Sequence, residues 1–556
     1  MQPVLSVEDV RWMEQQLDAS GVSLAELMER AGKATARELK RFFEEGSMSV
    51  DTVTILCGYG NNGGDGWVAA QLLQQIGCQV HVVTPLEPEA IHSELARKVA
   101  MRARDAGVPY VVLPSEDKLN ELLFSSDVVV DALLGTGFYG EPQPPLSNWI
   151  ASVNASGVRV VAVDVPSGLN AQTGEAAPCT MRADVTLTML TLKPGILGDA
   201  ARDVCGPLRI APLANPDKVL SLATDVDPVA WSVDVTDYYD VLPSQTSCVD
   251  KFTRGTVLVV GGSMRYVGAS ILAARAAARA GAGYVALAVP APIVPVVQSH
   301  LVEIPVVGLP CDTTKGCFAA EALPPIKELA SRYAAVVVGP GMMVSPSTMA
   351  IVKALLESDA PLVVDADALN CLSRLSDGKL DESPDLLRRT APVVLTPHRR
   401  ELGRLVGRAD NPPATLTDAI EAARRLVWAV GGSELCVVSK GTTTACVGVD
   451  RVFLPTPGPA ALATAGSGDV LAGLMGATLA KASDTLSNED LPLLCAMACE
   501  IHGYAGSIAA ERFGSRGVMA GDVADVLGLA TDMLEEQAIM IDDAGTPNVG
   551  APGVNA

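Results

Sequence analysis

The sequence predicts an α/β fold in two domains, and three observations lead to this prediction. The chain has 556 residues, which is more than one domain usually holds. Short apolar runs that fit β-strands alternate along it with helical segments, a pattern typical of βαβ units and a mostly parallel sheet. The alternation lapses once, between Pro212 and Arg254, and then resumes. We therefore predict domains at 1–230 and 231–540 and a flexible tail at 541–556.

The first domain is expected to open with two helices. Ser6 precedes acidic residues, and Ser23 lies three positions before Glu26, which is the pattern of a capping box. Strands and helices then alternate. The expected strands lie at 53–57, 78–83, 110–113, 128–133, 158–163 and 185–189, and the expected helices at 66–76 and 94–106.

The second domain repeats this alternation. Its expected strands lie at 257–260, 284–289, 335–338, 362–365, 393–396 and 435–439, and its expected helices at 269–280 and from Asp469 onward. The stretch 280–302 carries no charge over most of its length, but three prolines, Pro290, Pro292 and Pro295, interrupt it. We expect a strand followed by a loop there rather than a membrane span.

Composition and charge exclude several classes of protein. Lys and Arg number 41 against 64 Asp and Glu, so the net charge is −23, which disfavours nucleic acid or an anionic membrane as partner. A small anionic ligand remains possible because backbone amides bind phosphate without positive side chains. The twelve cysteines lack C-x-x-C spacing, and several lie singly in apolar runs. With acidic residues early and no long apolar block at the N-terminus, we expect no signal peptide and a cytoplasmic location.

A glycine-rich turn joins the first strand to the next helix. Gly58, Gly60 and Gly63 have the spacing of a dinucleotide-binding fingerprint. The following strand ends in Thr-Pro rather than in the acidic residue that would hold a ribose, which weighs against an ordinary nicotinamide-dependent oxidoreductase. Residues 61–65 still form a polar turn at a helix N-terminus, a favourable place for an anion.

Three oxygen-bearing residues follow strands that end at the same edge of this sheet. Asp131 follows one strand, Ser167 lies just after the next, and Asn62 lies in the glycine-rich turn. Because the carboxyl ends of neighbouring parallel strands share one crevice, the three together fit an all-oxygen site for a hard cation. The alternative is that they are only turn residues.

The second domain contains a different glycine-rich turn. Gly466, Ser467, Gly468 and Asp469 lead directly into a helix, so free amides there can face a phosphate while Asp469 deprotonates an attacking hydroxyl. The alternative is a glycine-rich turn with an Asp N-cap. Lys440 and the hydroxyls after it end a strand upstream and can bind a nucleotide.

The motifs of the first half resemble the NAD(P)H-hydrate epimerase family. They are LMERAG at 27–32, GNNGGDG at 60–66, DALLGTG at 131–137 and VDVPSGLNAQTG at 163–174, and the resemblance covers about residues 1–225. It implies a Rossmann-like three-layer α/β/α domain. By this resemblance the hydrated dinucleotide is held by Asn61, Asn62, Gly63, Gly64, Asp65, Gly135, Thr136, Gly137, Phe138, Tyr139, Gly140, Glu141 and Asp164. It also assigns Asn62, Asp131 and Ser167 to potassium.

The resemblance places Asp164 opposite the damaged nicotinamide ring. Inverting a hydroxyl-bearing ring carbon needs one group that protonates the departing oxygen and another that manages its return. We expect Asp164 to do the first. Lys193, in the segment after the last strand, is the candidate partner, and the alternative is that it is a surface lysine at a turn.

The motifs of the second half resemble the ribokinase-like superfamily and, more closely, the nucleotide-dependent NAD(P)H-hydrate dehydratases. In chain order they are GGS, YVGAS, GPG, DADALN, TPH, KGTTT and AGSGDVLAGL, and they span about residues 240–535. The resemblance assigns Ala269, Gly341, His398 and Asp469 to the hydrated dinucleotide. It assigns Lys440, Gly441, Thr442, Thr443, Thr444, Gly466 and Gly468 to the adenine nucleotide and its phosphates, with Asp469 as the base.

Some positions depart from the family pattern. Arg399 and Arg400 replace a Pro-Gly pair after the His, and Gln245 and Asp250 replace basic residues before the first strand of the second domain. These departures concern loops and leave the glycine-rich centre unaffected.

The resemblance implies a two-domain enzyme that repairs hydrated NAD(P)H. It interconverts the R and S forms of NADHX and NADPHX, and dehydrates the S form while ADP, bound with Mg²⁺, becomes AMP and phosphate. We expect a homo-oligomer. The alternative function is a ribokinase-like small-molecule kinase with a regulatory dinucleotide-binding N-terminal domain.

Overall fold

The structure is a computed structural model of the chain, and it describes residues 1–45, 50–238, 251, 253–432, 434–482 and 490–544. Gln245, Asp250 and the predicted tail from 545 onward lie outside the described residues. Two compact units are present: one contains Gln2–Ala230 and Thr415–Thr417, and the other contains Trp231–Ala414 and the described residues of 418–544.

The N-terminal unit is built on a seven-stranded parallel sheet with the strand order β4-β3-β2-β5-β6-β7-β8. Its strands are β2 (Thr52–Cys57), β3 (Gln79–Thr84), β4 (Tyr110–Val112), β5 (Val128–Ala132), β6 (Arg159–Val163), β7 (Val185–Met189) and β8 (Leu208–Ala211). The short strand β1 (Gln2–Val4) does not belong to this sheet. The chain builds β2, β3 and β4 in one direction and then returns to place β5 on the other side of β2. The strand order therefore reverses between β2 and β5, where ligands bind in folds of this kind.

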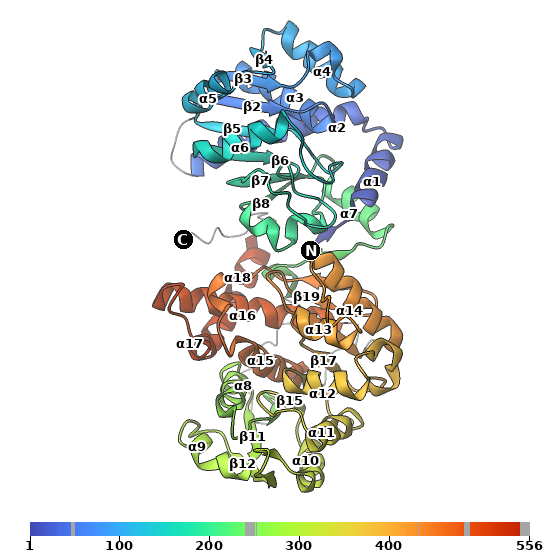
Figure 1. Cartoon of the computed structure of the whole chain (residues 1–556), viewed down its shortest axis with the longest axis vertical. Helices are drawn as coiled ribbons and strands as arrows, with labels where there is room; N and C mark the ends of the chain where they lie inside the picture. Colours follow the sequence, from blue (N-terminus) through green and yellow to red (C-terminus); the bar gives the residue numbers. More distant parts are fainter. Residues whose placement is uncertain (46–49, 239–250, 252, 433, 483–489, 545–556) are drawn as a thin grey trace. The chain divides into compact units, whose positions relative to one another are not determined.

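Helices cover both faces of this sheet, as the apolar strands require (Figure 1). One face is buried by α1 (Val7–Ala19), α2 (Leu24–Glu45), α3 (Asn61–Gln75), α4 (Glu94–Asp105) and α7 (Pro216–Thr224). The other is buried by α5 (Glu116–Ser125) and α6 (Leu146–Ser156). The predicted three-layer α/β/α arrangement is confirmed.

The C-terminal unit contains a larger sheet in which the strands lie in the order β9-β20-β19-β18-β17-β16-β15-β10-β11-β12. Those strands are β9 (Ala230–Ser232), β10 (Thr256–Val260), β11 (Tyr284–Pro290), β12 (Val306–Leu309), β15 (Ala335–Val338), β16 (Leu362–Val364), β17 (Val393–Leu395), β18 (Leu435–Ser439), β19 (Ala445–Val447) and β20 (Val452–Leu454). A separate short hairpin pairs β13 (Cys311–Asp312) with β14 (Cys317–Phe318). The strands from β12 to β18 are parallel, and β18, β19 and β20 are antiparallel. The strand order reverses between β10 and β15.

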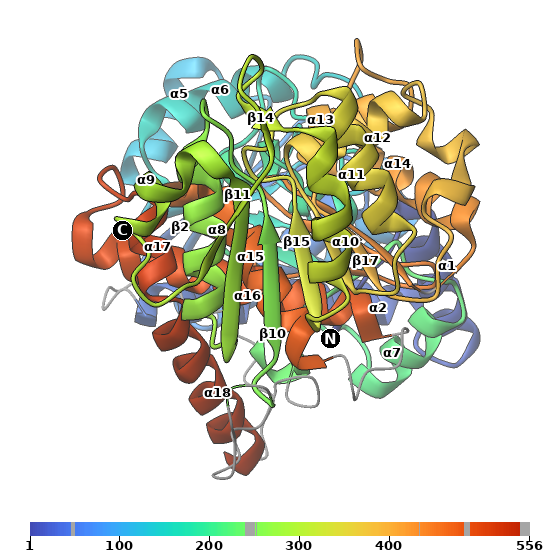
Figure 2. The same cartoon turned by 90° about the horizontal axis from the view of Figure 1, so that it is seen from below.

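This second sheet also lies between two layers of helices, as Figure 2 shows. One face carries α8 (Val267–Arg279), α15 (Ser467–Ala482), α16 (Leu491–Phe513), α17 (Ala520–Asp525) and α18 (Leu527–Ala544). The other carries α10 (Leu323–Ala330), α11 (Pro346–Leu356), α12 (Asp367–Leu375), α13 (Arg399–Leu405) and α14 (Leu416–Val430), while α9 (Val294–Gln298) precedes the edge strand β12.

One helix of the described part of the chain, α16, is long and apolar enough to cross a membrane. Most of it is buried, and side chains such as Leu494, Ala498 and Ile501 belong to the apolar core of the C-terminal unit. Helix α16 is therefore a core helix of the C-terminal unit.

Several expected boundaries differ from the structure. Helix α3 begins at Asn61 rather than at residue 66, because close packing against α2 and β5 accepts Gly64 and Gly66 inside a helix. The stretch after β11, expected to be a loop, contains α9. The lapse between 212 and 254 contains α7 and β9. Residues 541–544, expected in the tail, belong to α18.

Both sheets depend on glycines in the turns that follow neighbouring strands. An ideal Cβ on Gly58, just after β2, would lie 1.9 Å from the carbonyl oxygen of Leu133, just after β5. An ideal Cβ on Gly339, just after β15, would lie 1.8 Å from the carbonyl oxygen of Asp365, just after β16, and Gly339 also has a φ of +123°. The turns that follow neighbouring strands can therefore touch only because these positions lack a side chain.

The replacement Gly339→Ala should lower the free energy of unfolding of the C-terminal unit by about 3 kcal/mol, because overpacking and a positive φ act together. Hydrogen–deuterium exchange in urea measures this, since it reports each unit separately. Gly521→Ala in α17 is the matched control, because its Cβ meets nothing within 4 Å, and it should stay within about 0.5 kcal/mol. Equal stability of the two variants would contradict the packing argument.

Candidate active sites

The first cluster of predicted site residues lies where β2, β5 and β6 end. β5 lies between β2 and β6 in the sheet, so the turns after these three strands are neighbours. The first turn leads into α3, the second contains Asp131 to Glu141, and the third begins at Asp164. The structure therefore brings the three motifs of the first half to one edge of the sheet.

Asp131 and Ser167 form a buried pair at this edge. The Ser167 hydroxyl donates to Asp131 Oδ1 at 2.6 Å, and the Ser167 amide donates to Oδ2 at 2.8 Å. Burial raises the pKa of Asp131 to about 6, while the hydrogen bonds from Ser167 act in the opposite direction. Within the described residues Asp131 makes no ion pair, so its carboxylate is a buried negative charge with no protein cation beside it.

Asn62 lies against the DALLGTG turn. An ideal Cβ on Gly135 would lie 3.4 Å from Asn62 Oδ1. The Nδ2 atom of Asn62 is buried and makes no hydrogen bond within the described part of the chain. Two of the expected potassium ligands, Asp131 and Ser167, are thus in direct contact, and the third carries a polar atom that no protein group satisfies.

Asp164 is held by a buried lysine. Lys193 Nζ donates to Asp164 Oδ1 at 2.7 Å, to Thr188 Oγ1 at 2.9 Å and to the carbonyl of Met189 at 2.7 Å. Lys193 is fully buried, so the alternative that it is a surface lysine is wrong. Because three acceptors surround its ammonium group, the lysine fixes the carboxylate of Asp164 in place.

Asp164 also accepts two backbone hydrogen bonds. The amide of Met189 donates to Oδ1 and that of Thr136, in the DALLGTG motif, donates to Oδ2, each at 3.3 Å. Asp164 has a φ of +66°, which aims its side chain between the turns after β5 and β7. The expected neighbours Thr136 and Asp164 are therefore in contact.

The remaining residues of the 135–141 loop form an exposed rim. Tyr139 is 82% exposed, and Gly137, Gly140 and Glu141 are also exposed. Phe138 is half-buried and its amide donates to the carbonyl of Gly135 at 3.0 Å. Their predicted contacts with a dinucleotide stay predictions.

Two further carboxyls face Asp164. Burial raises the pKa of Asp65, and the charges of Asp164 and Glu14 raise it further. Burial also raises the pKa of Glu14, with Asp164 as the second cause, whereas Lys193 and Arg11 lower it. Sequence reasoning missed Glu14. A signal was present, because Val10, Met13, Glu14 and Leu17 have the spacing of one helix face and only Glu14 among them is polar.

The second cluster lies where the strands of the C-terminal sheet end. α15 begins at Ser467, so the glycine-rich turn stands at its N-terminus as predicted. Burial raises the pKa of Asp469 to about 7, Asp365 raises it further, and Lys440 lowers it. Lys440 Nζ lies 3.2 Å from the position of an ideal Cβ on Gly468, so the lysine and the turn are adjacent.

Asp365 connects this cluster. Its Oδ1 accepts from Lys440 Nζ at 2.8 Å and from Thr396 Oγ1 at 2.7 Å, and only 2% of its surface is exposed. The DADALN motif contains this residue, but sequence reasoning gave it no role. Its position directly after β16 was the available signal. The predicted nucleotide-binding residues 440–444 form the turn between β18 and β19.

His398 serves as the N-cap of α13. Its Nδ1 accepts from the amides of Arg400 and Glu401 at 3.1 and 3.2 Å, and its own amide donates to Glu401 at 2.9 Å. Burial lowers the pKa of His398 to about 4, with Lys440 as the second cause. The ring nitrogen that faces the helix is therefore occupied, and the predicted contact with substrate stays a prediction for the exposed part of the ring.

Ala269 and Gly341, which were assigned to the same ligand, lie together. An ideal Cβ on Gly341 would lie 3.1 Å from the Cβ of Ala269 and 2.5 Å from the carbonyl oxygen of Tyr266. This places the start of α8 against the turn that follows β15, at the reversal of strand order.

A second histidine, His502 on α16, lies beneath the glycine-rich turn. Its Nε2 is 3.3 Å from Ser467 Oγ, and the side chain is buried. Burial lowers the pKa of His502 to about 4, and Lys440 contributes in the same direction. No motif marked this residue, because it lies inside an apolar helix.

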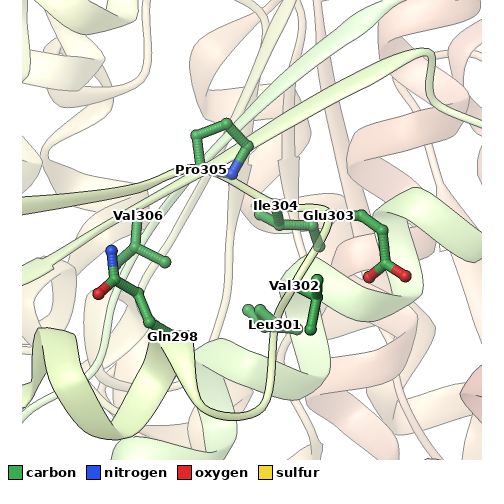
Figure 3. Close-up of a pocket in the computed structure, with 7 residues that line it drawn as sticks. All are labelled: Gln298, Leu301, Val302, Glu303, Ile304, Pro305 and Val306. Carbon is green, nitrogen blue, oxygen red and sulfur yellow. The ribbon is translucent and has the colours of Figure 1, made fainter.

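A hollow on the surface of the C-terminal unit lies elsewhere, as Figure 3 shows. It lies between the end of α9 and β12, and its lining is mostly aliphatic with one carboxylate, that of Glu303. Since no cluster of reactive groups faces it, we do not place a catalytic site there.

Comparisons with known proteins match the two halves of the chain to two families. A family model described as the YjeF-related protein N-terminus matches residues 24–195, and one described as NAD(P)H-hydrate dehydratase matches residues 257–528. A bifunctional NAD(P)H-hydrate repair enzyme of Salinibacter ruber is 33% identical over 526 residues, covering 92% of each chain. That of Moorella thermoacetica is 33% identical over 531 residues, covering 93% of this chain and 94% of the relative.

A solved structure is similar to the C-terminal part. It is an ADP/ATP-dependent NAD(P)H-hydrate dehydratase from Bacillus subtilis, 24% identical, with a TM-score of 0.43. The match covers 54% of this chain and 97% of that one.

Replacing Lys193 by Met should destabilise the N-terminal unit by about 3–5 kcal/mol, because it leaves the carboxylate of Asp164 buried beside no ammonium group. Urea unfolding followed by hydrogen exchange in the N-terminal unit measures this loss. The double variant Lys193→Met, Asp164→Asn should regain part of it, since it removes both charges. If the double variant were no more stable than Lys193→Met, the ion pair would not be the cause.

His502 should make the C-terminal unit sensitive to acid. Its pKa is about 4 when folded and about 6.5 when unfolded, so the unfolded chain binds the proton more tightly. Stability from this residue is therefore present above pH 6.5 and lost as the pH falls to 4, by roughly 3 kcal/mol. Unfolding experiments across this range should show that His502→Gln lacks this component, and an unchanged pH dependence would contradict the assignment.

Proposed function

This chain belongs to the family of bifunctional NAD(P)H-hydrate repair enzymes, and we propose that it repairs hydrated NADH and NADPH with one active site in each unit. The N-terminal site interconverts the R and S forms of the hydrate. The C-terminal site dehydrates the S form, with ADP converted to AMP and phosphate. The observation that carries the proposal is that each unit gathers its own family motifs at the carboxyl ends of neighbouring parallel strands.

We assign the chemistry of the epimerase site to Asp164. Its carboxylate is fixed by Lys193 and by two backbone amides, and it lies beside the glycine-rich turn at the start of α3, whose free amides suit the phosphates of a dinucleotide. A carboxylate held in this way can exchange protons with a hydroxyl on the ring. Lys193 is a positioning residue, because its buried ammonium group already donates to Asp164, Thr188 and Met189.

We assign a potassium ion to Asn62, Asp131 and Ser167. Two features support this: the ligand atoms that these side chains offer include oxygens, and the Asp131 carboxylate is buried without a protein cation. When bound, such an ion supplies fixed positive charge next to an anionic dinucleotide.

In the dehydratase site we assign the base to Asp469. With a pKa of about 7, it exists partly as the carboxylate at neutral pH and can take the proton of the ring hydroxyl. The amides of residues 466–468 at the start of α15 face the phosphoryl group that the hydroxyl attacks, and Lys440 lies beside them. Loss of phosphate from the ring, with loss of a proton from the neighbouring ring carbon, then restores the double bond.

We expect the Mg²⁺ ion to enter the site bound to the nucleotide. Among the described residues no group of three or more His, Cys, Asp and Glu side chains is arranged to hold a metal. Mg²⁺ bound to the phosphates of ADP therefore fits this site better than a resident ion. ADP rather than ATP, a cytoplasmic location and a homo-oligomeric assembly are further parts of the proposal.

Asp164→Asn and Asp469→Asn separate the two activities in the full chain. Asp164→Asn should slow epimer interconversion about 100-fold or more while the S form is still dehydrated, and Asp469→Asn should do the reverse. NADH formation at 340 nm measures dehydration, and chromatography of the epimers without ADP measures interconversion. Dehydration by the unmodified chain should rise with pH through about 7, as Asp469 loses its proton.

The outcome also tests the kinase alternative. If the unmodified chain formed no NADH from either epimer and instead phosphorylated another small alcohol stably, the repair function would be excluded.

A further inference from the structure

Helix α1 lies along the epimerase site and is held there by hydrogen bonds. Just before it, the amide of Leu5 donates to the carbonyl of Leu192 at 3.0 Å, directly next to Lys193. At its first residue, the amide of Val7 donates to Gln172 Oε1 at 2.9 Å. One turn later, Arg11 Nη2 lies 3.5 Å from the position of an ideal Cβ on Gly137. The helix thus runs from the segment that holds Asp164 to the loop that follows β5.

The inward face of α1 carries one acid. Val10, Met13 and Leu17 are buried, and Glu14 occupies the remaining position of this stripe. Glu14 lies three residues after Arg11, so both side chains leave the helix on the side of Gly137. Burial of apolar surface explains why Val10, Met13 and Leu17 point inward, but it does not explain why a carboxyl group occupies the same face.

Glu14 is partly buried and has no direct partner. Within the described residues its carboxyl makes no hydrogen bond and no ion pair, although it retains some exposure to solvent. Its charged surroundings come from four elements: Arg11 on α1, Asp65 on α3, Asp164 after β6 and Lys193 after β7. Lys193 is already committed to Asp164 at 2.7 Å, so it cannot also pair with Glu14.

The two carboxyls therefore differ in what they can do. Asp164 accepts three hydrogen bonds, one of them from an ammonium group, and these hold its carboxyl group in a fixed orientation. Glu14 has no such donors, and burial together with the charge of Asp164 raises its pKa. A pair of carboxyl groups in unequal environments is the usual arrangement for an acid and a base in one site.

We propose that Glu14 is the second acid–base residue of the epimerase site and works opposite Asp164. The inference rests on the proposed epimerase function. It follows from the position of Glu14 on the inward face of a helix that contacts both the segment holding Asp164 and the 135–141 loop.

The proposed step is balanced as follows. Glu14 gives its proton to the hydroxyl as the carbon–oxygen bond breaks, and water leaves while the lone pair of the ring nitrogen forms a carbon–nitrogen double bond. A water molecule then adds to the other face of the carbon–nitrogen double bond. The π electrons of that bond return to the nitrogen, and the added water gives a proton to Asp164. The reverse reaction returns the proton from Asp164 to Glu14, and exchange with solvent resets the pair between turnovers in one direction.

Glu14→Gln in the full chain tests the proposal. It should lower kcat for epimer interconversion about 100-fold or more with little change in KM, because a general acid typically contributes 10²–10⁴ in rate. Exchange of the ring hydroxyl with ¹⁸O-labelled water, measured without ADP, should slow by the same factor. Glu14→Asp should recover part of the rate, since it keeps a carboxyl.

Two controls separate this role from a structural one. Glu8→Gln makes the same change on the exposed side of α1 and should leave interconversion unchanged. Hydrogen exchange in the N-terminal unit of each variant reports whether that unit is folded, and dehydration of the S form reports the same for the C-terminal unit. If Glu14→Gln interconverted the epimers at the rate of the unmodified chain, or if only KM rose, the proposal would be overturned while the epimerase function stood. If the unmodified chain interconverted nothing, the proposed function itself would fail.

Discussion

The close approach of neighbouring turns at the carboxyl edge of each sheet is the constraint on which both active sites depend. In the N-terminal unit the turn after β2 meets the turn after β5 at Gly58, and in the C-terminal unit the turn after β15 meets the turn after β16 at Gly339. A side chain at either position would lie within 2 Å of a backbone carbonyl, so the strands could not end side by side. The turn after β5 supplies Thr136, whose amide donates to Asp164, and the turn after β16 begins with Asp365, which accepts from Lys440. The turns that meet at these glycines therefore also contact the groups of each site.

Both sites contain several buried carboxyl groups and compensate part of their negative charge with a lysine. The chain carries a net charge of −23 and places several carboxyls at the ends of buried strands. In each unit one lysine pairs with one aspartate: the buried Lys193 with Asp164 at 2.7 Å, and the partly buried Lys440 with Asp365 at 2.8 Å. The carboxyls left without such a partner respond to burial by holding their protons more tightly, as Glu14 and Asp469 do. Each site thus combines a fixed aspartate with a second carboxyl whose pKa is raised.

Much of the fold could be predicted because both sheets are parallel and buried. Strands covered on both faces must be apolar along their whole length, so runs such as 335–338 and 435–439 were identified with their observed bounds. Helix ends were harder to locate where packing overrides propensity, as at Asn61, where glycines that usually end a helix lie in its first turns. The site motifs could be predicted because turn residues directly after a strand have few structural reasons to be Asp, Ser or Asn. Glu14 and His502 could not be found in this way, because they lie within helices.

The sequence by itself determined the two α/β units, their family and the short list of residues that follow the strands. This information is local, since it depends on periodicity and on the residues of single turns. Tertiary structure alone decided which residues act on one another, because strand order brings together turns that are far apart in the chain. The tertiary structure buries Lys193 beside Asp164 rather than leaving it on the surface, and it pairs Asp365 with Lys440. It also orients the N-terminal helix so that Glu14 lies on its inward face. The charge that a carboxyl carries depends on these neighbours and on its burial, and neither can be inferred from the residues beside it in sequence.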